Sequence, residues 1–424
     1  MKLFYLIFLA ILSQDISAKP SYKNYKVYKI TPKSKDALKI LKDLKKEEKD
    51  FSAFQFWKKP IKVGHDVALM IGPEIQQNFE QMLNDSYFDR RVLMKDVQKA
   101  IDNENRFWKS NVKNSVNWTV YNTLDEINNW LESLATEFPS YITILKPGKT
   151  YEGRDIVGVK LDFNPGTQKK VVFMESNIHA REWISSAVNT YILDQFLRNT
   201  QTDIRALAQK FTWYFFPVMN PDGFVFSHTD DRLWRKTRTS YGLHYGADPN
   251  RNWDYKWMTN NGASLYPGEI NYAGPHPFSE KSVKVMSEFI ASITSNMIAY
   301  IAFHSFSQVL LLPYGHTKEP LDNYNEMMGI AKVAMAKLEA VHNTKYTFGN
   351  VGEEMYIATG TSMDWVKGNF HIPIVCTYEL RPQFEKPGES GFILPSEQIL
   401  PTGEETLVSL IPIFEEYEKL HPST

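Results

Sequence analysis

The chain has 424 residues, of which 43% are hydrophobic, 14% aromatic and 23% charged, a composition typical of globular proteins with ample core material. The 48 Lys and Arg residues against 49 Asp and Glu residues give a formal charge of −1, so no overall field would attract nucleic acid or an anionic membrane. The single cysteine, Cys376, excludes an intramolecular disulfide framework and a cysteine-based zinc or redox site. Histidine and carboxylate side chains would therefore have to hold any metal.

Residues 1–18 have the pattern of a secretory signal peptide: one basic residue, an apolar run over residues 3–12, then small or polar residues. The apolar run is shorter than the roughly 18 to 20 residues that span a bilayer, so we expect removal rather than anchoring. The sequence thus predicts a secreted, extracellular protein. The sequons at Asn84 and Asn117 are candidate glycosylation sites in that setting.

Residues 19–109 predict a small α+β domain, rich in Lys, Asp and Glu with short apolar stretches between them. Strands are predicted over residues 25–30, 51–56, 66–71 and 91–94, and helices over residues 34–44, 73–84 and 95–108. The domain ends in a polar stretch that contains Arg106 and Lys109. This stretch is either a site for a trypsin-like protease or a plain domain linker.

From residue 110 to residue 424 the composition shifts towards Trp, Tyr and Gly, and apolar strands alternate with amphipathic helices. The clearest strands are predicted over residues 156–161, 171–175, 211–218, 297–303 and 373–380, and the clearest helices over residues 183–197, 279–294, 323–342 and 402–420. The tetrapeptide Asn220-Pro221-Asp222-Gly223 has the residues of a turn. The alternation of strands and helices predicts an α/β domain.

Three histidines have an acidic residue three positions later, a spacing with which both side chains can bind one metal ion: His179/Glu182, His228/Asp231 and His316/Glu319. About one such pair is expected by chance, so the spacing alone is weak. The second and third pairs lie in polar stretches that predict solvent-exposed loops. The first pair instead follows an apolar strand and opens an amphipathic helix, and sites in open α/β sheets lie at the carboxyl ends of strands.

Two further polar residues occur at the ends of predicted strands. His304 directly follows strand 297–303, and Glu379 lies near the end of strand 373–380, on one face with Val375 and Thr377. A carboxylate in an otherwise apolar strand is costly to bury without a partner or a function. Each residue taken alone is compatible with a satisfied polar group of the core, but their joint occurrence at strand ends favours a functional site.

The segments His179-Ala180-Arg181-Glu182-Trp183, His304-Ser305-Phe306 and Glu379-Leu380-Arg381 resemble, in this order, the motifs of the zinc metallocarboxypeptidases of the pancreatic carboxypeptidase A/B type. Further matching stretches lie at residues 121–127, 151–154, 233–238, 250–253 and 313–315, so the resemblance covers essentially the whole chain. It implies a mixed central sheet flanked by helices, preceded by an activation domain. The chain would then be a procarboxypeptidase A-like zymogen.

Carried over by position, the resemblance implies one zinc ion per chain, held by His179, Glu182 and His304. Glu379 would be the general base and proton shuttle for the water that the zinc activates. Arg235 would stabilise the oxyanion. The chemistry agrees, because such a zinc site keeps one position open for water, and a nearby carboxylate can take its proton.

The same resemblance implies the substrate-binding residues. Asn250 and Arg251 would hold the terminal carboxylate of the substrate, Tyr356 would close over the site, and Arg181 would assist further along the peptide. Asp248 would orient His179. A guanidinium fork suits a carboxylate bidentately, and an internal peptide bond presents no carboxylate there.

Met363 matches the position at the bottom of the side-chain pocket in this family. The other positions that the resemblance places in the pocket are also uncharged: Ala302, Leu311, Gly315, Val351, Ala358 and Thr377. A charged side chain would lose its water there without a partner, so the pocket favours C-terminal aromatic and large aliphatic residues. Glu353 and Glu354, on the preceding loop, leave open a contribution from basic C-terminal residues.

The sequence departs from the family at two places. Residues 242–273 contain no cysteine where several vertebrate relatives have a disulfide, and Phe306 stands where Tyr is usual; neither change removes a matched catalytic position. The expected partners of a monomeric chain are peptides and proteins with a free C-terminus and an activating trypsin-like protease. The alternatives are an inactive binding protein on the same scaffold, which would lack a metal ligand or the base, and a prohormone-processing carboxypeptidase, which lacks a leading activation segment.

Overall fold

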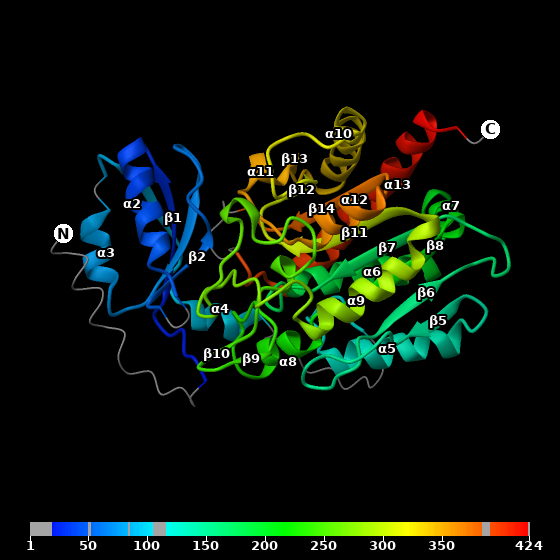
Figure 1. Ribbon diagram of the computed structural model, residues 1–424, viewed down its shortest axis with the longest axis horizontal. Helices are drawn as coiled ribbons and strands as arrows, with labels where there is room; N and C mark the ends of the chain where they lie inside the picture. The colour runs from blue at the N-terminus through cyan, green and yellow to red at the C-terminus, as the bar shows by residue number, and fades with distance from the viewer. Residues whose placement is uncertain (1–18, 50–51, 84, 105–115, 384–390, 423–424) are drawn as a thin grey trace. The chain divides into compact units, whose positions relative to one another are not determined.

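The computed structural model describes residues 19–49, 52–83, 85–104, 116–383 and 391–422 (Figure 1). These residues form two compact units. The first contains the described residues before position 107 and the short stretches 268–270 and 382–395, and the second contains the remainder. The predicted signal segment, the sequon at Asn84 and the cleavage positions Arg106 and Lys109 lie outside the described residues. None of the described helices is both long enough and apolar enough to cross a membrane.

The first unit is an antiparallel sheet packed against helices, and its described strands follow the order β2-β3-β1-β4. Its elements are β1 (Lys26–Pro32), α2 (Lys35–Lys46), β2 (Phe54–Lys58), β3 (Val67–Ile71), α3 (Gln76–Met82), β4 (Phe88–Met94) and α4 (Val97–Glu104). One apolar core joins Ile30 and Leu69 of the sheet to Leu41 of α2 and Phe79 of α3. This confirms the small α+β fold predicted from the sequence, although α3 begins three residues after Pro73.

The second unit contains a mixed sheet, whose eight strands within the described residues have the order β13-β12-β14-β11-β7-β8-β6-β5. The strands are β5 (Ile142–Leu145), β6 (Gly158–Leu161), β7 (Val171–Ser176), β8 (Thr212–Phe216), β11 (Met297–Ser305), β12 (Val309–Leu312), β13 (Thr347–Asn350) and β14 (Ile374–Leu380). The four central strands β14, β11, β7 and β8 are parallel, and β12 and β6 flank them antiparallel. The predicted mixed α/β architecture is therefore confirmed.

Helices cover both faces of this sheet (Figure 1). They are α5 (Leu124–Glu137), α6 (Trp183–Arg198), α7 (Thr202–Lys210), α8 (Pro221–Thr229), α9 (Lys281–Ile293), α10 (Tyr324–His342), α11 (Val351–Glu354), α12 (Ser362–Phe370) and α13 (Ile399–Leu420). Helices α9 and α12 share a core with Phe173 and Tyr300 of the sheet. On the opposite face the Tyr378 hydroxyl lies 2.8 Å from the Ser409 hydroxyl of α13. Because the central strands are buried on both faces, their sequences are almost continuously apolar.

Two local predictions from the sequence are wrong around α8. Asn220-Pro221-Asp222-Gly223 is the start of that helix: Asn220 caps it by accepting a hydrogen bond from the Gly223 amide (3.1 Å), and Pro221 is its first residue. His228 lies in the same helix instead of a solvated loop, and its ring stacks on Trp183 with 3.8 Å between centroids. A Pro after Asn fits a helix start as well as a turn, and a helix buried along most of its length lacks the amphipathic pattern that would distinguish the two.

Candidate metal centre

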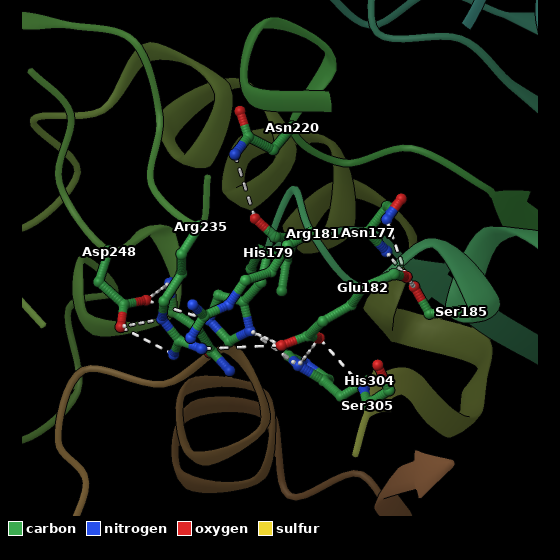
Figure 2. A network of polar contacts seen from close by, with 12 residues as sticks. Asn177, His179, Arg181, Glu182, Ser185, Asn220, Arg235, Asp248, His304 and Ser305 are labelled. Atoms are coloured by element: carbon green, nitrogen blue, oxygen red, sulfur yellow. Dashed lines mark hydrogen bonds and ion pairs between the residues drawn. The ribbon is translucent and has the colours of Figure 1, made fainter. Parts of the chain in front are cut away.

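Three side chains converge at the carboxyl ends of the neighbouring strands β7 and β11 (Figure 2). His179 lies in the turn after β7, Glu182 lies immediately before α6, and His304 lies near the end of β11. The Nδ1 atom of His179 is 2.9 Å from one carboxylate oxygen of Glu182, and the Nδ1 atom of His304 is 3.1 Å from the other. The two Nδ1 atoms are themselves 3.1 Å apart. All three residues are buried.

The donor set and spacing fit a zinc ion. Ligand atoms about 2.0 to 2.2 Å from a tetrahedral zinc lie about 3.4 Å from one another, which is close to the separations between these three side chains. Two imidazoles and one carboxylate are also a known ligand set of catalytic zinc sites, which keep a fourth position open. His179, Glu182 and His304 are therefore the residues that hold the metal.

The buried charges around the site shift its protonation equilibria in opposite directions. Burial lowers the pKa of His179, and the charge of Arg235 adds to the effect. Burial acts the same way on His304, but the Glu182 carboxylate outweighs it and raises the pKa of that imidazole to about 9. Burial would raise the pKa of Glu182, but the two imidazoles hold it below its usual range. A zinc ion therefore enters a site that already contains a carboxylate in its ionised form.

Asp248 orients His179 from the side away from Glu182 (Figure 2). Its Oδ1 atom is 3.2 Å from the Nε2 atom of His179. Because a carboxylate can only accept, Nε2 carries the hydrogen and Nδ1 is left with a free lone pair for a metal. The Asp248 carboxylate is fully buried; burial alone would raise its pKa, but Arg235 and Arg251 hold that pKa well below its usual range.

Arg235 is fixed by the same carboxylate. Its Nε and Nη2 atoms donate to the Oδ2 atom of Asp248 at 3.2 and 2.9 Å, and its Nη1 atom lies 3.7 Å from a carboxylate oxygen of Glu182. Only 12% of the Arg235 side chain is exposed, so this residue is not a basic side chain on the solvent-exposed surface. Its guanidinium is thus held beside the metal centre before any substrate arrives.

Glu379 lies across from His304 in the parallel register of β14 and β11. Burial raises the pKa of its carboxyl to about 8, against the opposing charges of His304 and Arg235. Val375, Thr377 and Glu379 alternate along β14, so they lie on one face of the sheet, as predicted from the sequence. The structure therefore places a carboxyl group with a near-neutral pKa next to the metal ligands.

Asn250 and Arg251 belong to the short 3-10 helix η2 (Pro249–Arg251), which Asp248 caps by accepting from the Asn250 amide (2.9 Å). The side-chain oxygen of Asn250 accepts from the Ser362 backbone N–H at 2.8 Å, so its NH₂ group is the end left for other partners. The Nη2 atom of Arg251 donates to the Tyr356 hydroxyl at 3.3 Å. The Asn250 NH₂ group and the Arg251 guanidinium are thus two hydrogen-bond donors close to Asp248 in the chain.

Arg181 is buried in the turn that carries His179 and Glu182, and its Nη1 atom donates to the Leu233 carbonyl at 3.4 Å. Figure 2 places it beside these ligands.

Met363 lies in the first turn of α12, where its sulfur accepts from the Thr377 hydroxyl at 3.6 Å. Ala302 and Leu311 flank Thr377 on the neighbouring strands, and they share the core of Met363 with Val351. Glycine is needed at position 315, because a Cβ there would lie 2.9 Å from the Ala358 carbonyl oxygen. Glu353 and Glu354 are exposed on α11. The structure thus brings the six positions and Met363 together. Their own side chains are uncharged, while the buried Asp364 carboxylate accepts from the Gly315 amide at 2.8 Å and Glu175 lies in register with Ala302.

Some contributors to the site carried no signal in the sequence. The Ser305 amide donates to the second oxygen of Glu182 at 3.2 Å, and the Asn177 side chain donates to the Glu182 carbonyl at 3.0 Å. Both are small polar residues next to strand ends, a common feature of loops. The third His-acid pair is in a loop, as predicted, but the Nδ1 atom of His316 lies 2.9 Å from the buried Asp364 carboxylate rather than facing Glu319.

Comparisons with known proteins agree with this geometry. The profile of the zinc carboxypeptidase family matches residues 127–409, and that of the carboxypeptidase activation peptide matches residues 28–104. The chain is 40% identical over 412 residues to zinc carboxypeptidase A 1 of Anopheles gambiae, covering 97% of this chain and 93% of that protein. It is 42% identical over 294 residues to carboxypeptidase B of Astacus astacus, covering 69% and 95%.

The crystal structure of the carboxypeptidase A from Helicoverpa armigera superposes with a TM-score of 0.84 at 26% identity, covering 95% of this chain and 99% of that one. The catalytic-domain match spans the three metal ligands, and the activation-peptide match lies within the first unit. The chain therefore belongs to the zinc carboxypeptidase family and is a zinc-dependent metallocarboxypeptidase that carries an activation peptide.

Proposed function

We propose that this enzyme is secreted as a zymogen and, once cleaved, removes C-terminal residues from peptides and proteins, with a preference for aromatic and large aliphatic side chains. One observation carries the proposal: Glu379 and Arg235 lie beside the metal ligands, Asn250 and Arg251 adjoin Asp248, and uncharged side chains cluster around Met363.

Glu379 is the proton acceptor of the proposed reaction. Bound zinc would polarise the scissile carbonyl and lower the pKa of water to about 7. The Glu379 carboxylate takes a proton from the attacking water and returns it to the leaving nitrogen. Its pKa of about 8, raised by burial, lies close to neutral pH, where a group can both accept and release a proton.

Arg235 stabilises the negative charge that develops on the carbonyl oxygen. Two of its nitrogens donate to Asp248, and the third lies on the side of the metal ligands. A guanidinium held in this way needs no reorganisation during the reaction, which is the condition under which electrostatic stabilisation is most effective.

Asn250 and Arg251 select the end of the chain. The Asn250 NH₂ group and the Arg251 guanidinium are donors, and a free C-terminal carboxylate offers the matching acceptors. An internal peptide bond lacks this charge, so these donors favour exopeptidase activity. Tyr356, which contacts Arg251, would cover the bound residue, and Arg181 would contact the peptide further from its end.

The pocket around Met363 sets the side-chain preference. The side chains proposed to line it are uncharged, so a Lys, Arg or Glu side chain would lose its water without a partner among them, at a cost of several kcal/mol. A large apolar side chain would gain roughly 1.5 to 3 kcal/mol on full burial. The relatives are named as A and as B enzymes, so their names do not decide this preference.

Activation and export follow from the N-terminal part of the chain. Residues 19–109 would form the activation domain and residues 110–424 the catalytic domain, with cleavage by a trypsin-like protease near Arg106 or Lys109. Removal of residues 1–18 in the secretory pathway would yield an extracellular, monomeric proenzyme.

The test uses the full chain before and after trypsin treatment, with peptides that differ only in a C-terminal Phe, Leu, Lys or Glu. We expect activity on large peptides only after cleavage, highest kcat/KM for Phe and Leu, and loss of turnover with a chelator. Equal hydrolysis before and after cleavage would contradict the zymogen, and a higher kcat/KM for Lys or Glu would contradict the apolar pocket.

A further inference from the structure

Glu175 is a fully buried carboxyl group that none of the proposed catalytic steps uses. It lies near the carboxyl end of β7, four residues before the first metal ligand, His179. Burial raises the pKa of its carboxyl above the usual range. A group of this kind next to a catalytic centre calls for a physical reason.

The strand register places Glu175 in one row with three positions that are proposed to line the side-chain pocket. Glu175 of β7 pairs with Ala302 of β11, Ala302 pairs with Thr377 of β14, and Thr377 pairs with Leu311 of β12. Paired residues project from the same face of a sheet. Glu175 is thus the one ionisable residue of this row, and its face of the sheet is the one that packs against α12.

The contacts of Glu175 lead to the residue proposed to bind the substrate carboxylate. Its Oε1 atom accepts from the Tyr300 hydroxyl at 2.8 Å and from the Ser362 hydroxyl at 3.4 Å. Ser362 is the first residue of α12, and its backbone N–H donates to the Asn250 side-chain oxygen at 2.8 Å. Ser362 therefore links Glu175 to Asn250.

The second carboxyl oxygen of Glu175 is buried and has no hydrogen-bond partner among the described residues. A buried polar atom without a hydrogen-bond partner destabilises the folded protein. Replacing a buried ionisable group by an apolar side chain of similar volume is often stabilising. Packing alone is thus a poor reason for a carboxyl group here. Accepting hydrogen bonds from Tyr300 and Ser362 is what an apolar residue could not do.

We propose that Glu175 is a positioning residue for recognition of the C-terminal carboxylate. By holding Ser362 at the start of α12, it fixes the side-chain oxygen of Asn250 and so presents the Asn250 NH₂ group to the substrate. This inference rests on the proposed role of Asn250.

The test compares Glu175→Leu with Glu175→Gln in the zinc-loaded, trypsin-treated protein. The Gln variant keeps a carbonyl oxygen that can accept from Tyr300 and Ser362, so its KM should stay within about threefold of the wild type. The Leu variant should raise KM about tenfold, the size of one lost hydrogen bond to a charged group, with kcat changed far less. Zinc content and melting temperature are measured for each variant.

Binding of a matched pair of ligands separates positioning from a general structural effect. Glu175→Leu should weaken binding of N-acetyl-phenylalanine, which has the carboxylate, and leave binding of N-acetyl-phenylalanine amide unchanged. In an Asn250→Ala background the substitution should have almost no further effect on KM, because both changes remove one function. Equal weakening of both ligands, or additive effects of the two substitutions, would overturn the proposal.

A crystal structure of Glu175→Leu gives a readout that does not depend on activity. We expect the Asn250 amide to be turned or displaced from Ser362. An unchanged contact between them would overturn the inference even if the enzyme is a carboxypeptidase. Conversely, a wild-type protein that cleaves no peptide C-terminus would refute the proposed function, while a displaced Asn250 would still support the positioning role of Glu175.

Discussion

Two histidines lie around the start of α6, His304 buried and His228 partly buried, and they differ in what faces the imidazole. His304 faces the Glu182 carboxylate, which outweighs burial and raises its pKa to about 9. His228 stacks on Trp183, the residue after Glu182, and contacts the ring of Phe224. Burial and the charge of Arg232 lower its pKa to about 3. Burial favours the neutral imidazole in both environments, and only a facing carboxylate reverses the effect.

The comparison shows why the spacing of a histidine and an acid does not by itself make a metal site. In the His228/Asp231 pair the Asp231 carboxylate accepts from the Leu233 amide at 3.0 Å, while the His228 ring packs among aromatic side chains. The Arg232 guanidinium lies on the same Trp183 ring, 3.7 Å from its centroid. A cation and aromatic faces hold a neutral imidazole but offer no ligand set for zinc.

Exchanging each histidine for alanine gives the largest contrast between the two environments. His304→Ala removes one of three zinc ligands, so we expect loss of stoichiometric zinc and at least about a 10⁴-fold loss of kcat/KM. His228→Ala should keep one zinc per chain and measurable activity. Metal analysis and peptide hydrolysis of both variants check this. Full zinc in His304→Ala would show that the ligand set is wrong.

Glu379→Gln removes the charge of the carboxylate that lies across from His304 and leaves the metal ligands in place. The amide has nearly the same shape but cannot accept the proton, so kcat should fall by about 10² to 10⁴ while zinc is retained. Binding of a product amino acid should stay close to that of the wild type. Near-normal turnover would mean that another group is the base.

Much of this arrangement is visible in the sequence because it depends on strand ends. His179, His304 and Glu379 follow or end strongly apolar strands, and parallel strands bring their carboxyl ends to one edge. Two of the strands absent from the clearest predictions, β12 and β13, have four residues each, too few for a period to emerge.

The supporting contacts could not be predicted for a different reason. Ser362 and Glu175 are 187 positions apart, and their contact depends on how α12 packs on the sheet. The polar neighbours of His228 predict a loop from composition. Ser227 and Asp231 instead make local hydrogen bonds around α8, and composition does not show these bonds. Chain spacing predicts which residues reach one strand end, but not which small polar side chains meet there.

Met363→Asp extends the comparison to the proposed pocket, where a carboxylate would replace an uncharged side chain. The new carboxylate would supply a partner for a cationic side chain. We expect the ratio of kcat/KM for C-terminal Lys over Phe to rise about 100-fold, the effect of roughly 3 kcal/mol. Met363→Leu is the matched control and should keep the preference for Phe. An unchanged ratio in Met363→Asp would place the specificity-determining residue elsewhere.

The smallest predicted effect is the pH dependence that His228 gives to the free energy of unfolding. An unfolded chain protonates His228 near pH 6.5, whereas the folded protein resists protonation until about pH 3, so acid favours the unfolded state between these values. His228→Phe keeps a stacking ring on Trp183 but cannot bind a proton. As pH falls below about 6, the free energy of unfolding of the wild type should therefore drop relative to that of the variant by about 1.4 kcal/mol per pH unit. Urea unfolding of both proteins at pH 7, 6, 5 and 4 measures this difference, and parallel pH profiles would show that His228 is not held neutral.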